Sequence, residues 1–140
     1  MATKTENNKA LWTVQVLLAL VFLLAGGSKL VLPLEAMQGA VPMPGSFIRF
    51  IGVVEVTGSL GLLLPGIFRI RTYLTPIAAI GLVLIMSGAT TITIESGMVG
   101  AAVIPAIVGS LAALIVFGRR VWLNTEAAAP QVLVRRLRAA

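Results

Sequence analysis

This chain of 140 residues contains no cysteine and no histidine, the residues that most often carry redox and metal chemistry. Without cysteine there are no disulfides, thiol relays or thiolate metal sites, and without histidine the commonest ligand of zinc and haem is missing. Aspartate is also absent, so five glutamates are the only carboxylate side chains. We therefore expect no haem, no metal site and no redox chemistry carried by this chain alone.

Charge is scarce as well. Charged residues make up 11% of the sequence, against roughly 25% in soluble domains, and 58% of the residues are hydrophobic. The hydrophobic residues form four runs, at about 10–31, 47–64, 73–94 and 98–117. Each is close to the roughly 20 residues that cross a hydrocarbon core. The sequence predicts an all-α integral membrane four-helix bundle, a single domain over 1–140, in which Pro65 ends the second helix.

The positive charges predict the orientation. All but two of the 11 basic residues lie outside the runs and on one side, namely Lys4, Lys9, Arg69, Arg71, Arg119, Arg120, Arg135, Arg136 and Arg138. The positive-inside rule then places both termini in the cytoplasm. Because these cations flank membrane spans and form no soluble basic face, we exclude nucleic acid and expect the lipid bilayer as the partner.

The basic segment 118–140 is predicted to be a cytoplasmic tail. Its last residues, QVLVRRLRAA after Pro130, alternate apolar residues with arginines. A short basic amphipathic segment on an anionic membrane surface is one interpretation. We favour a frayed end that serves only the topology, because short isolated helices are marginal.

Charged residues also intrude on the spans. Glu55 is the deepest, about 12 Å from the start of its run at 1.5 Å per residue. A carboxylate at that depth must be protonated, hydrated or paired. Lys29 is the better partner, because it enters from the same side, whereas Arg49 lies about 120° around the same helix as Glu55.

Ser87, Thr90 and Thr91 form one polar stripe at helical spacing, near the depth of Glu55. The sequence therefore predicts a polar intramembrane site formed by Lys29, Glu55, Ser87, Thr90 and Thr91, with Arg49 and Glu95 at its mouth. This site either binds a ligand or pairs helices. We assign no catalytic residue and no metal ligand to it.

Small residues recur at four-residue spacing in the last run, at Ala102, Ala106 and Ser110. Such faces allow helix backbones to approach closely in lipid. Packing within the bundle is the expected use, and a homo-oligomer through this helix is the alternative.

Two motifs carry a resemblance to a known family. The stretch WTVQVLLALVFLLAGGSKL, with G-x-x-K-L at Gly26 to Leu30, resembles the first helix of the DoxX-like family. The stretch RFIGVVEVTGSLGLLLP resembles the second helix of that family. Its motif comprises Arg49, Gly52, Glu55, Gly58, Gly61, Leu62 and Pro65. The resemblance runs from Trp12 to about Ile94, and the last run matches only in hydrophobicity.

The resemblance implies a small multi-pass protein of the bacterial inner membrane. Some relatives are subunits of thiosulfate:quinone oxidoreductase or partners of membrane redox enzymes. It thus favours a non-catalytic accessory subunit or partner-recruiting protein of a quinone-linked redox system, with quinone as the candidate ligand. Two alternatives stay open: a small carrier or proton-coupled exporter using Glu55 and Lys29, and an enzyme acting on a lipophilic substrate.

Overall fold

The computed structural model describes residues 2–37 and 42–138, and the side chains of residues 8–37 and 42–120. Its elements are α1 (Ala2–Val31), the short 3-10 helix η1 (Leu34–Met37), α2 (Gly45–Phe68), α3 (Leu74–Glu95) and α4 (Val99–Arg138). Four segments are long and apolar enough to cross a membrane, namely Asn8–Val31, Gly45–Phe68, Leu74–Glu95 and Val99–Arg120. The prediction of an all-α, four-helix membrane protein is confirmed.

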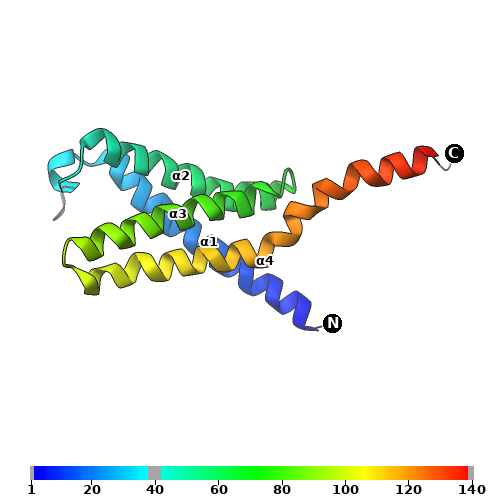
Figure 1. The fold of residues 1–140 in the computed structure, drawn as a ribbon, viewed down its shortest axis with the longest axis horizontal. Coiled ribbons are helices and arrows are strands. Elements are labelled where there is room, and N and C mark those ends of the chain that lie inside the picture. Colours follow the sequence, from blue (N-terminus) through cyan, green and yellow to red (C-terminus); the bar gives the residue numbers. More distant parts are fainter. Residues whose placement is uncertain (1, 38–41, 139–140) are drawn as a thin grey trace.

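The four helices form a closed ring in chain order. α1 packs against α2 and α4, and α3 packs against α2 and α4. Figure 1 shows α2, α3 and the first half of α4 running side by side, with α1 crossing them obliquely. Each helix contributes a fully buried apolar side chain to the centre, namely Phe22, Leu62, Leu82 and Ile115.

Large apolar side chains cover the outside of the bundle. Leu24 on α1, Leu84 on α3 and Ile104 on α4 are 74%, 68% and 69% exposed. Soluble monomers rarely expose contiguous apolar surface on this scale, because its contact with water is unfavourable. The exterior is therefore that of a helix bundle whose outer faces contact lipid.

Helix α2 continues past its predicted end at residue 64. Pro65 is buried inside the helix, which ends at Phe68. Proline removes one backbone donor but does not itself stop the next turn. Termination comes from Arg69, whose φ of 54° is left-handed and whose backbone N–H donates to the carbonyl of Pro65.

The basic tail differs from the frayed end that the sequence predicted, because α4 is helical to Arg138. An isolated short helix is unstable because helix nucleation is unfavourable, whereas this tail continues a helix that has already formed. Figure 1 shows the last turns of α4 projecting away from the bundle. The side chains of Arg135, Arg136 and Arg138, like that of Lys4, lie outside the described residues.

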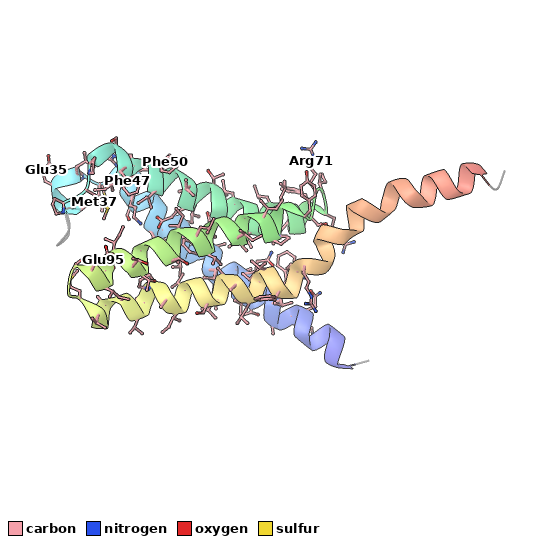
Figure 2. All side chains as sticks on the ribbon, viewed as in Figure 1. Glu35, Met37, Phe47, Phe50, Arg71 and Glu95 are labelled. Atoms are coloured by element: carbon pink, nitrogen blue, oxygen red, sulfur yellow. The ribbon has the colours of Figure 1, made fainter. Side chains whose placement is uncertain are left out.

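The two ends of the bundle differ in charge. Figure 2 shows Glu35 and Glu95 at one end and Arg71 at the other. Arg71 and Arg69 both lie in the connection between α2 and α3. We name these the acidic end and the basic end.

Candidate functional site

Two glycines set the closest approach of α1 and α2. A Cβ atom on Gly26 would lie 2.8 Å from the carbonyl oxygen of Gly52, and one on Gly52 would lie 3.0 Å from the carbonyl oxygen of Gly26. The helix backbones are therefore in contact, which only glycine at both positions allows. The Cβ of Glu55 lies 2.9 Å from the position of a Cβ on Gly26, and the Cβ of Lys29 lies 3.0 Å from that of a Cβ on Gly52. Both side chains therefore start at the crossing, within reach of each other.

Lys29 and Glu55 form an ion pair. The Nζ atom of Lys29 donates to Oε2 of Glu55 at 2.6 Å. The Glu55 side chain is only 3% exposed, whereas that of Lys29 is 29% exposed. A buried carboxylate needs such a partner, because moving an ion from water into a protein interior is unfavourable by on the order of several kcal/mol.

Arg49 interacts with the end of α1 and not with the carboxylate. Its guanidinium donates to the backbone carbonyl of Lys29 and, at 2.9 Å, to that of Leu32. The last carbonyls of a helix accept no hydrogen bond from within the helix. A cation that binds them supplies the missing donor and also stabilises the negative end of the helix dipole. Arg49 thus holds the α1 turn that carries Lys29.

Replacing Arg49 with lysine is expected to destabilise the protein by about 1.5–3 kcal/mol, because an ammonium cannot reproduce the two-pronged donation to both carbonyls. Hydrogen exchange should show faster opening of the last turn of α1. Arg71→Lys is the control, because Arg71 is exposed. Unchanged exchange at residues 29–32 in the Arg49 variant would contradict this role.

A cavity of about 350 Å³ adjoins the ion pair. It is lined by Lys29, Met43, Phe47, Phe50, Ile51, Glu55, Leu84, Ile85, Met86, Gly88, Ala89, Ile92 and Thr93. Phe50 and Leu84 on its lining are 59% and 68% exposed, so the cavity reaches the lipid-facing surface between α2 and α3. Figure 2 shows Phe47 and Phe50 near the acidic end. The site is an apolar recess with one ion pair on its wall.

The hydroxyl stripe on α3 lies elsewhere. Ser87, Thr90 and Thr91 line a separate cavity of about 440 Å³ between α3 and α4, together with Ala106 and Ser110. Their hydroxyls donate to backbone carbonyls four residues earlier on α3. The structure therefore brings Lys29 and Glu55 together but not these three residues with them.

The two residues predicted at the mouth, Arg49 and Glu95, do not line the cavity. Glu95 is exposed at the last residue of α3, and Arg49 binds α1. Instead Thr93, half-buried on α3, supplies the hydroxyl of the cavity wall, and that hydroxyl donates to the carbonyl of Ala89 at 2.7 Å. Thr93 continues the buried stripe of Leu82 and Met86, the signal that could have identified it.

A second polar cluster, near the basic end, was not predicted. Gln15 is fully buried, donates to the carbonyl of Leu62 and accepts a hydrogen bond from Nε of Arg119 at 3.2 Å. Arg119 is 4% exposed, although its sequence position suggests a residue outside the span. The detectable signal was Gln15, the single amide within the apolar run of α1.

Comparison with known proteins gives one match. A model of the DoxX-like family matches residues 13–115, which include the crossing glycines, the ion pair and the cavity lining. No curated protein and no solved structure matches the chain.

Proposed function

The chain belongs to the DoxX-like family, and from this membership and the cavity beside Lys29 and Glu55 we propose that it is a non-catalytic, quinone-binding accessory subunit of a membrane redox system. The observation that carries the proposal is a lipid-accessible apolar recess with one ammonium donor and one carboxylate on its wall.

The cavity suits a flat, apolar molecule with a polar edge. Its volume falls within the range of about 300–1,000 Å³ that is usual for ligand pockets. Phe47 and Phe50 offer apolar faces to a ring, and the partly exposed ammonium of Lys29 offers a donor to a ring carbonyl. The opening between α2 and α3 leaves room for an apolar tail in the bilayer.

The proposal of a non-catalytic role is based on the side chains that could carry out redox chemistry. The chain has no cysteine or histidine, and within its described part no cluster of three carboxylate, histidine or cysteine side chains could hold a metal ion. Electron-transfer groups would therefore be supplied by a partner enzyme. Lys29 and Glu55 would position the quinone for that partner.

We also propose that the protein lies in the inner membrane of a bacterium with its basic end in the cytoplasm. Support comes from Arg69, Arg71, Arg119 and Arg120, which all lie at or beyond span ends on that side. Cytoplasmic flanks are enriched in lysine and arginine.

Quinone that copurifies with the protein tests the binding proposal. Wild type and two variants, Glu55→Gln and Gly88→Leu, are extracted in a mild detergent, and bound quinone is quantified by mass spectrometry. We expect wild type to retain quinone and both variants to lose most of it. Glu55→Gln weakens the polar contact, whereas Gly88→Leu fills the recess without touching the ion pair, since a Cβ on Gly88 meets no atom within 4 Å.

Two matched controls make the test specific. Glu35→Gln neutralises an exposed carboxylate outside the cavity, and Gly81→Leu adds the same bulk in a different groove on α3. Both are expected to retain quinone at the level of wild type. Quinone that is absent from wild type, or equal in all five preparations, would overturn the proposal.

A further inference from the structure

The recess beside the ion pair has very few polar groups on its wall. Among the described residues that line it, only Lys29, Glu55 and Thr93 carry a side-chain nitrogen or oxygen atom. The remaining lining side chains are aliphatic, aromatic or thioether groups, with one glycine. The hydrogen bonds that these three polar residues already make therefore decide which kind of quinone ring fits the recess.

Among the described side chains of this wall, Lys29 is the one that can donate to a ligand. Its ammonium carries several hydrogens, and the hydrogen bond to Oε2 of Glu55 uses one of them. The hydroxyl of Thr93 has a single hydrogen, which it donates to the carbonyl of Ala89 at 2.7 Å. The Glu55 carboxylate of the ion pair only accepts hydrogen bonds. A quinone thus finds a donor for one of its carbonyls at Lys29.

The opening of the recess determines how a quinone enters it. Phe50 on α2 and Leu84 on α3 are both exposed and line the recess where it reaches the lipid-facing surface. The isoprenoid tail of a quinone leaves through this opening, because the tail is apolar and the bilayer surrounds it there. The ring edge opposite the tail then points into the recess. In ubiquinone that edge carries methoxy groups, whereas in a naphthoquinone it carries a fused aromatic ring.

The interior of the recess, which receives this edge, is apolar. Ile85 and Ala89 on α3 are half-buried, line the recess and pack against the buried core of the bundle. Ile51 on α2 is half-buried, and Met86 on α3 is 9% exposed. Methoxy oxygens placed against these side chains lose the donors available at the membrane surface and gain none. A fused aromatic ring loses no hydrogen bond and gains contact with aliphatic and thioether groups.

We propose that the recess binds naphthoquinones in preference to methoxy-substituted benzoquinones. One ring carbonyl accepts a hydrogen bond from Nζ of Lys29, and the fused ring lies against Ile51, Ile85 and Ala89. This inference rests on the proposed quinone binding and narrows it to one class of ring. Selection comes from the shortage of donors in the interior of the recess.

Titration with two quinones tests the preference. Delipidated wild type in neutral detergent is titrated with a menaquinone, which is a naphthoquinone, and with a ubiquinone of equal tail length. Native mass spectrometry counts the bound ligand. We expect the menaquinone to bind about tenfold more tightly, on the scale of one acceptor left without a donor. Gly88→Leu fills the recess, so it gives the background binding elsewhere and is expected to show no preference.

Two variants on α2 locate the preference. Ile51→Gln adds a donor to the interior of the recess, so it is expected to raise the affinity for ubiquinone and narrow the difference. Val54→Gln is the matched control, because Val54 is also a half-buried aliphatic residue of α2 but lines a different groove. Its preference should equal that of wild type.

The outcomes separate this inference from the proposed function. Equal or tighter binding of ubiquinone to wild type would overturn the preference and leave quinone binding intact. The same narrowing in Ile51→Gln and Val54→Gln would also overturn it, because the preference would then not arise in the recess. Binding of neither quinone to wild type would overturn the proposed function and this inference with it.

Discussion

Replacing Lys29 with methionine is expected to destabilise the protein by about 3 kcal/mol or more, the scale seen when one partner of a buried ion pair is removed. The change leaves Glu55, whose side chain is 3% exposed, without its counter-charge. Replacing Glu55 with methionine should destabilise less, because the Lys29 side chain is 29% exposed near the end of its span and can extend its ammonium toward water. The two single variants should therefore differ in stability.

The double variant Lys29→Met with Glu55→Met is expected to recover most of the lost stability. Two apolar side chains of similar length need no counter-charge, so the pair can be replaced at little change in free energy. Reversible unfolding in mixed detergent micelles gives the free energy of unfolding of wild type, the two single variants and the double variant under the same conditions. A double variant as unstable as the sum of its parents would show that the two side chains are not energetically coupled.

The same double variant separates structure from function. If the ion pair only aligns α1 with α2, a stable double variant should still copurify with quinone. If the pair contacts the quinone, the double variant should be folded and quinone-free. The second result is expected, because the ammonium and carboxylate are the charged groups on the wall of an otherwise apolar recess.

The sequence predicted the parts of the structure that depend on position along a helix. Hydrophobic run lengths identified the four spans, because the bilayer thickness fixes how many residues are needed. Residue counting also gave the depth of Glu55, since each helical residue rises by a constant distance. Lys29 was predicted as the partner of Glu55 because both residues lie toward the same side of the membrane in their helices.

The sequence did not predict which face of α3 meets the cavity. In an amphipathic helix the apolar stripe identifies the buried face, but α3 is apolar around most of its circumference. Ser87 and Thr91 lie on an exposed face, whereas Thr93 lines the cavity that Glu55 also lines. In lipid both faces of a helix are apolar, so rotation about its axis is set by packing and not by polarity.

The burial of Arg119 was not predicted, for a related reason. Counting positive charges treats every arginine near a span end as exposed, whereas this one lies 4% exposed against α1. Its burial depends on Gln15 and Asn8, more than 100 residues earlier in the chain. Such long-range pairing leaves no periodic signal in either segment.

Substitution of Gly26 with alanine is the most direct test of how the fold builds the site. Its added Cβ would lie 2.8 Å from the carbonyl oxygen of Gly52 and 2.9 Å from the Cβ of Glu55. Because backbone atoms cannot move aside as a flexible side chain would, α1 and α2 must separate. The expected loss of stability is about 2–3 kcal/mol, at the upper end of the range for overpacked sites.

Gly27→Ala is the matched control, because a Cβ on Gly27 meets no atom within 4 Å. Its stability should equal or exceed that of wild type, by up to about 1 kcal/mol, since alanine has the higher helix propensity. Unfolding of both variants in the same micelles gives the comparison. Equal stability of the two variants would mean that the helices do not meet at Gly26.

The glycine crossing and the ion pair should also be coupled. When Gly26→Ala forces the helices apart, the 2.6 Å contact between Lys29 and Glu55 lengthens, and the loss of Lys29 then removes less stabilisation. Lys29→Met should therefore destabilise Gly26→Ala by less than it destabilises wild type, whereas its effect in Gly27→Ala should be unchanged. Additive effects in both backgrounds would show that the charged pair forms without the close crossing. Coupling confined to Gly26 would show that close backbone contact is what positions the ion pair at the wall of the cavity.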